Sequence, residues 1–240
     1  MVYGPLSLGE HVISGYRVKV ASLQDGLSYA RVSERGEVLT SARLVGGIGL
    51  TLAPIEPVAG PASNLVECIY VRLGVPVVVD DRVELTILAP VDYSVVAQRG
   101  NESQTVIDAF PEARLPYKLA LYGPPTQGLI CRFYTFTDTD TPGPGLAQVN
   151  VWIRNNTGNV ARVRSIVLPL THIRVFYKPG TWIARLSEVR VTLESSNVAK
   201  VDVDDNPPSA DFDLSPDIIS ANVPRIAPFA RESFTMLWGY

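Results

Sequence analysis

Short runs of alternating or continuously apolar residues recur along the whole chain, and they are rich in valine, isoleucine and threonine. Such runs are typical of strands, because β-branched side chains pack well on a pleated sheet. Turn-forming pairs such as Asp25-Gly26 and Arg35-Gly36 separate the runs. The pattern predicts strands over residues 11–20, 27–33, 36–45, 48–53, 65–73, 83–89, 92–98, 105–110, 117–122, 128–136, 147–154, 160–168, 172–178, 182–194, 198–203 and 232–238.

The composition supports an all-β fold. The chain has 31 Val, 14 Ile and 14 Thr, and its 19 Pro and 18 Gly leave little room for helices of ordinary length. Many short strands favour two β-sandwich domains, with the polar stretch 98–103 as the boundary: residues 1–100 and residues 101–240. A predicted hairpin around Asn155–Asn159 and a closing strand with Phe234, Met236 and Trp238 on one face make the second domain immunoglobulin-like. A single larger sandwich is the alternative.

Overall composition limits the possible function classes. With 46% hydrophobic and 19% charged residues, the 240-residue chain can bury a core. Its net charge of -3 does not favour polyanion binding by the chain as a whole. The N-terminus lacks a secretory signal pattern and no apolar run is long enough to span a bilayer, so a cytoplasmic protein is expected. Cys68 and Cys131 could pair, but free buried thiols are expected in a reducing compartment.

Four segments together resemble a known family. They are Pro54-Ile55-Glu56-Pro57-Val58, Ala89-Pro90-Val91-Asp92, Val106-Ile107-Asp108-Ala109-Phe110, and the stretch from Lys118 to Arg132. The family is an uncharacterised archaeal one, known only as a domain of unknown function, and the resemblance covers most of the chain. It implies an archaeal origin and brings no established activity.

Candidate catalytic residues are few. His11 and His172 are the only imidazoles and both lie in strand-like runs, which disfavours a hydrolytic triad. Asp108 lies between apolar residues, so its carboxylate needs a partner, and Arg114, Lys118 and Arg132 are the expected cations. The carboxylates of Glu56, Asp92 and Asp108 could instead act on glycans if two of them met in one cleft. Glu56, Asp92, Asp108, Lys118 and Arg132 thus form one candidate cluster.

A second candidate site is a basic face in the second half of the chain. Between Arg114 and Lys200 the sequence has eleven basic and four acidic residues, whereas residues 201–240 have two basic and seven acidic. By strand alternation, Trp152 shares a face with Arg154, Arg162 with Arg164, and Arg174 with Lys178. Such a face could bind a polyanion. The acidic segment could equally fold back and neutralise it.

The acidic segment also resembles part of a calcium-binding loop. Asp202, Asp204 and Asn206 match the first three ligand positions, since oxygen donors at alternate residues can converge on one ion. The match then fails, because Pro207 occupies the position of the turn glycine and Asp213 that of the bidentate glutamate. A solvated acidic connection is the simpler interpretation, and no cofactor is expected.

These observations favour a non-enzymatic binding or assembly module that uses sheet faces, edges or an interdomain groove. The alternatives are a carboxylate-based enzyme acting on glycans and polyanion binding through the basic face. A second copy of the chain or another protein is a plausible partner, because an apolar surface patch needs cover. Nucleic acid and membranes are not expected partners.

Overall fold

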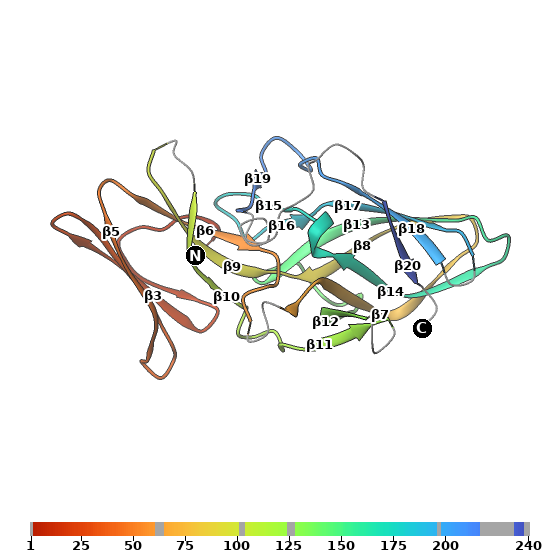
Figure 1. Ribbon diagram of the computed structural model, residues 1–240, viewed down its shortest axis with the longest axis horizontal. Coiled ribbons are helices and arrows are strands. Elements are labelled where there is room, and N and C mark those ends of the chain that lie inside the picture. The colour runs from red at the N-terminus through yellow and green to blue at the C-terminus, as the bar shows by residue number, and fades with distance from the viewer. Residues whose placement is uncertain are drawn as a thin grey trace.

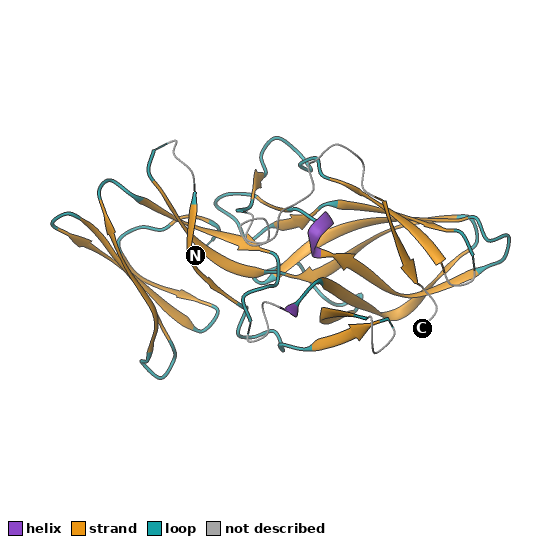
Figure 2. Ribbon diagram, in the orientation of Figure 1, coloured by secondary structure: helices purple, strands orange, loops and turns teal. Residues whose placement is uncertain are grey.

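The computed structural model describes residues 2–60, 65–100, 104–123, 128–195, 198–216 and 233–237. In these ranges twenty strands form four sheets (Figures 1 and 2). The described ranges contain no α-helix, and one of the short helical turns drawn in Figure 2 is the 3-10 helix Leu170–His172. The all-β fold class is therefore confirmed. No helix in the described ranges has the length and apolarity needed to cross a bilayer.

Four strands near the N-terminus form an antiparallel meander, at the left of Figure 1. They are β2 (Gly9–Ile13), β3 (Tyr16–Leu23), β4 (Gly26–Val32) and β5 (Val38–Val45). Ser14 and Gly15 form the β2–β3 turn with φ of 52° and 79°, because two-residue hairpin turns need positive φ to match the strand twist. The single strand predicted over 11–20 is wrong: it is two strands, and the apolar pattern continues across the turn.

A second sheet lies next to the meander. Its order is β1 (Gly4–Pro5), β6 (Gly49–Ile55), β9 (Asp92–Gln98) and β10 (Thr105–Phe110). Strand β9 is buried on both faces over most of its length. The register between β9 and β10 shifts between Val106 and Asp108. This bulge brings Asp108 and Phe110, instead of Val106, to the buried face.

Aromatic contacts join the meander to the rest of the molecule. The ring of Tyr16 on β3 lies 5.2 Å from that of Phe110, centroid to centroid, and Phe110 lies 5.5 Å from Tyr93. Tyr93 lies 6.0 Å from Trp182, which in turn lies 4.9 Å from Tyr3. These edge-to-face and tilted contacts stabilise beyond simple area burial. The ring of Tyr16, at the start of β3, thus attaches the meander to the second sheet.

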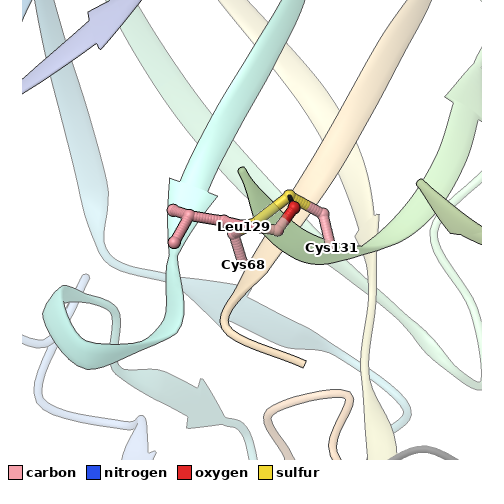
Figure 3. Close-up of a disulfide and its surroundings, with 3 residues drawn as sticks. All are labelled: Cys68, Leu129 and Cys131. Carbon is pink, nitrogen blue, oxygen red and sulfur yellow. Dashed lines mark hydrogen bonds between the residues drawn. A yellow bond between two sulfur atoms is a disulfide. The ribbon is translucent and has the colours of Figure 1, made fainter. Parts of the chain in front are cut away.

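The third sheet has the order β11 (Leu119–Tyr122), β12 (Leu129–Phe136), β7 (Cys68–Val79) and β14 (Ala161–Pro169). Its central strands β7 and β12 are parallel, with Cys68 opposite Cys131. The two Cα atoms are 4.4 Å apart and the sulfur atoms form a disulfide (Figure 3). The expectation of free thiols is wrong, because residues 63 positions apart meet at one register position.

The fourth sheet is built around β13 (Leu146–Asn155), which pairs with β8 (Arg82–Pro90) on one side and with β16 and β17 on the other. The remaining strands are β15 (Val175–Tyr177), β16 (Ala184–Leu186), β17 (Glu188–Leu193), β18 (Val198–Asp204), β19 (Asp213–Leu214) and β20 (Ser233–Leu237). The strand predicted over 182–194 is interrupted at Ser187. The closing strand is confirmed by the pairing of β20 with β18, although the predicted shared face of Phe234, Met236 and Trp238 lies outside the described side chains.

The third and fourth sheets share one hydrophobic core, to which both contribute buried Val, Ile and Leu side chains. Two connections between these sheets, from β7 to β8 and from β13 to β14, meet at the end of the molecule distant from the meander (Figure 1). The hairpin predicted around Asn155–Asn159 is therefore wrong, because β13 and β14 lie in different sheets. At this end of the molecule the buried Asn155 amide donates to the carbonyls of Val79, Asp80 and Asn159 at 2.7 to 3.0 Å. These bonds satisfy the backbone of both turns, which keeps the two sheets in register.

Several strand pairs cross the boundary predicted at residue 100. Strand β9 pairs with β10, β8 with β13, and β7 with both β12 and β14. A cut at residue 100 would therefore run through three of the sheets. The division into two sandwiches and the immunoglobulin-like character of the second half stay predictions from the sequence.

Candidate functional site

Two members of the predicted charged cluster do lie close together in the interior. Asp92 begins β9 and is 1% exposed, and Arg132 on β12 is 2% exposed. Asp92 Oδ2 accepts a hydrogen bond from the Ala59 amide at 2.7 Å, while Oδ1 has no hydrogen-bond partner. The Arg132 guanidinium stacks on the Tyr117 ring, 3.7 Å from its centroid, and its Nε and Nη1 make no hydrogen bond. The two charges attract each other electrostatically without a direct bond.

Burial dominates the ionisation of this pair. It raises the pKa of Asp92 to about 6, although the Ala59 amide and Arg132 both act in the opposite direction. Burial also lowers the pKa of Arg132, against the attraction of Asp92. An ionised carboxylate in this interior position therefore costs stability at neutral pH.

The substitution Asp92→Asn is expected to stabilise the protein at pH 7.5. The carboxyl pKa is higher in the folded chain, about 6, than its usual value of 3.8, so the Asp92 contribution is most favourable below pH 4 and is lost as the pH rises through 6. Two pKa units correspond to about 3 kcal/mol, an upper estimate for the gain. Urea unfolding at pH 7.5 and 4.5 should show a gain at the higher pH that disappears at the lower. A loss of stability at pH 7.5 would mean that the buried Arg132 guanidinium depends on the negative charge of Asp92.

Asp108 is buried and paired, but not with the predicted cations. Arg31 Nε donates to Asp108 Oδ2 at 2.7 Å, and Tyr29 Oη donates to the same oxygen at 2.7 Å. Arg31 and Tyr29 lie on β4 of the meander. The expected partners Arg114, Lys118 and Arg132 are thus wrong, because the meander folds against β10 and brings β4 to Asp108.

The three carboxylates considered for glycan chemistry do not share one face of the second sheet. Strand alternation places Asp92 on the face opposite Tyr93, whereas Asp108 faces the same side as Phe110, the partner of Tyr93. Glu56 is buried just after β6, near Asp92. Lys118 is exposed. Asp108 is committed to its pair with Arg31, so it does not join the other two carboxylates.

The residues of the predicted basic face separate into three places. Arg162 and Arg164 lie on β14, in the third sheet, while Trp152 and Arg154 lie on β13 in the fourth. Lys178 follows β15 and pairs with Asp211 at 2.6 Å. Arg174 immediately precedes the same strand, and its backbone amide donates to Ser187 Oγ. The predicted single face is therefore wrong, because the residues belong to different sheets.

The outer face of the fourth sheet carries ions of both signs. Arg190 Nη2 lies 3.0 Å from Glu188 Oε1 and 4.0 Å from Asp204 Oδ2. Lys200 Nζ lies 3.6 Å from Asp202 Oδ1. Part of the acidic segment therefore neutralises this face. Trp152 lies on the same face and is 43% exposed. Arg154, two residues further along β13, lies opposite Arg82 on β8.

The calcium-loop residues occupy a strand and its end. Asp202 and Asp204 lie on β18, and Asp204 Oδ1 accepts bonds from the backbone and side-chain amides of Asn206. These contacts form a local turn. In the described ranges, no three His, Cys, Asp or Glu side chains gather where they could hold a metal ion.

The outer face of the third sheet carries arginines but, unlike that of the fourth sheet, no paired carboxylates. We call the arginines Arg72, Arg162 and Arg164 the basic sheet face. All three side chains are exposed, and none has an ion pair within the described residues. Ser165, next to Arg164, lies opposite Arg72. The register then shifts between Ser165 and Val163, so that Arg162 lies opposite Val78, further along β7. Strands β7, β11, β12 and β14 contain no aspartate or glutamate. Neighbouring cations without carboxylates repel each other, which an anionic ligand would relieve.

Aromatic side chains adjoin Arg72 on the two central strands of the same sheet. Tyr70 on β7 lies opposite Phe133 on β12, with the ring centroids 5.7 Å apart and the rings stacked. Both are half-buried. Buried Ile69 and Val71 point to the opposite, core side. This face is buried at the disulfide, where Cys68 and Cys131 are inaccessible to solvent. It is exposed at Arg72 and Arg162.

Sequence reasoning missed Arg72, Tyr70 and Phe133 as site residues. The alternation of Tyr70 with Arg72 is visible in the sequence and predicts a common face. Their proximity to Arg164 and Phe133 depends on which strands flank β7, and the parallel pairing with β12 in particular has no short-range sequence pattern.

The fold and these faces define an all-β protein with charged and aromatic sheet surfaces. Residues 2–237 match the family described as "Protein of unknown function (DUF432)", and the chain belongs to this family. The family resemblance seen in the sequence is thereby confirmed. Neither the comparison with curated proteins nor that with solved structures gives a match.

Proposed function

We propose that this protein is a non-enzymatic binding module that holds an acidic polymer against the basic sheet face. The observation that carries the proposal is the group of Arg72, Arg162 and Arg164, exposed on a sheet whose strands have no acidic residue. Each arginine can form charge-assisted bonds to an anionic group. The backbone positions of Arg72 and Arg162 are set by the pairing of β7 with β14, and Arg164 lies at the register shift between the paired segments.

The arrangement of the carboxylates favours this function over the glycan enzyme. A retaining or inverting glycosidase needs two carboxyl groups across one sugar-binding cleft. Asp108 is engaged by Arg31 and Tyr29, and it lies on the other face of its sheet from Asp92. Glu56 and Asp92 lie near each other, but they are only 3% and 1% exposed, which leaves no access for a sugar. The charged outer face of the fourth sheet is a weaker candidate for the polymer, because acidic residues pair with Arg190 and Lys200.

Binding to fluorescein-labelled heparin, measured by anisotropy, tests the proposal. Three neutralised charges should give a steep salt dependence, with binding about 20- to 40-fold weaker at 200 mM than at 50 mM salt. The double substitution Arg162→Ala/Arg164→Ala should remove most of this dependence. The matched control is Arg190→Ala, an exposed arginine on the other sheet that is already paired. Unchanged binding by the double variant would refute the proposal.

A further inference from the structure

The basic sheet face adjoins aromatic rings at positions where a polymer of bases could stack. Tyr70 and Phe133 lie at paired positions of the two central strands in a four-stranded sheet. Tyr122, on the edge strand β11, continues the group, 6.3 Å from Tyr70 by ring centroids. A four-stranded sheet with aromatic side chains on its central strands is one of the arrangements that binds unstacked bases of single-stranded RNA.

The neighbouring row of residues supplies the other groups that such a ligand needs. Thr135, Arg72 and Ser165 are paired across β12, β7 and β14, two positions along the strands from Phe133 and Tyr70. Successive positions on one strand face are about 6.6 Å apart. A base on the aromatic rings would therefore have a cation and two hydroxyl groups within reach of its sugar and phosphate. Hydroxyl side chains can both donate to and accept from a ribose 2′-OH.

We propose that the acidic polymer is single-stranded RNA, with bases stacking on Tyr70 and Phe133, phosphates bound by Arg72, Arg162 and Arg164, and the ribose contacted by Thr135 and Ser165. The proposal rests on the function proposed above. It goes beyond charge alone, because sulfated glycans have no flat faces to stack on the rings. The overall negative charge argues against nucleic acid binding by the chain as a whole, but the four strands of this sheet contain no carboxylate.

The test compares four probes by fluorescence anisotropy at 50 mM salt: rU12, dU12, a 12-base-pair duplex DNA and heparin. The ring variants are Tyr70→Leu and Phe133→Leu, which keep an apolar side chain in the sheet. Tyr70→Phe keeps the ring, and Trp152→Leu removes an exposed ring from the other sheet. Circular dichroism and thermal melts confirm that each variant is folded, and a variant that unfolds is replaced by its Met counterpart.

We expect rU12 to bind more tightly than dU12 and duplex DNA. Each Leu variant should weaken rU12 binding by about 5- to 100-fold, the usual effect of losing a stacked base. Heparin binding should not change in the ring variants, Tyr70→Phe should keep more rU12 affinity than Tyr70→Leu because it retains the ring, and Trp152→Leu should bind rU12 as the native chain does.

The outcomes separate the two proposals. Heparin binding that depends on Arg162 and Arg164, together with rU12 binding that does not change in the ring variants, overturns the RNA proposal alone. Equal affinity for dU12 or for the duplex overturns it as well. If neither heparin nor rU12 binds, the binding function itself is refuted.

Discussion

Replacing both Cys68 and Cys131 by alanine is expected to lower the free energy of unfolding by about 4 kcal/mol. The disulfide links positions 63 residues apart and so removes a large part of the conformational freedom of the unfolded chain. For a chain of this size, the melting temperature should fall by about 8 to 16 °C. Thermal melts of the native chain and of the double variant measure the difference.

Reduction provides the control for this prediction. The native chain in a thiol-free phosphine reductant should melt close to the double variant, and the variant itself should not respond to the reductant. If the fully reduced native chain melts at the oxidised temperature, the bond does not stabilise the fold. The disulfide also bears on the predicted cytoplasmic location, because disulfides are rare in the cytosol outside hyperthermophiles.

Substituting Asp108→Ala should cost about 3 to 5 kcal/mol, because it leaves the Arg31 charge largely buried without a partner. The Arg31 side chain is only 11% exposed, and Tyr29 loses its acceptor at the same time. The pair joins β4 to β10, so the meander should loosen first. Urea unfolding gives the total cost, and amide hydrogen exchange should show faster exchange in β2–β5 than in β7 and β13.

The matched control is Asp25→Ala. Asp25 pairs with Arg43 at 2.9 Å in the same meander, but the two side chains are 42% and 67% exposed. Exposed pairs contribute about 0 to 1 kcal/mol, so this variant should be close to the native chain. Equal effects of the two substitutions would show that burial of the Asp108 pair is unimportant.

The meander has a second attachment, which limits how far Asp108→Ala can release it. Ser14 Oγ and Tyr93 Oη both donate to the buried carboxylate of Glu112, and the Ala113 amide donates to Ser14 Oγ at 2.6 Å. We therefore expect partial loosening of the meander and not its complete detachment.

Local patterns predicted much of the secondary structure. The alternation over 83–89 and 147–154 corresponds to β8 and β13, and the end of the chain does form a strand. The errors have a common cause. Ser14-Gly15 and Ser187 interrupt strands without interrupting the apolar pattern, because the residues on either side still bury alternate side chains.

The sequence by itself determined that this chain forms strands, that Asp108 needs a buried partner, and that arginines at alternate positions share a face. These properties depend on backbone propensity and on the two-residue period of a strand, which act over a few residues. Only the tertiary structure decided that the partner is Arg31, that Cys68 meets Cys131, and that Arg72, Arg162 and Arg164 lie on paired strands of one sheet. Those meetings depend on which distant strands pair, and pairing is chosen by burial of the whole core.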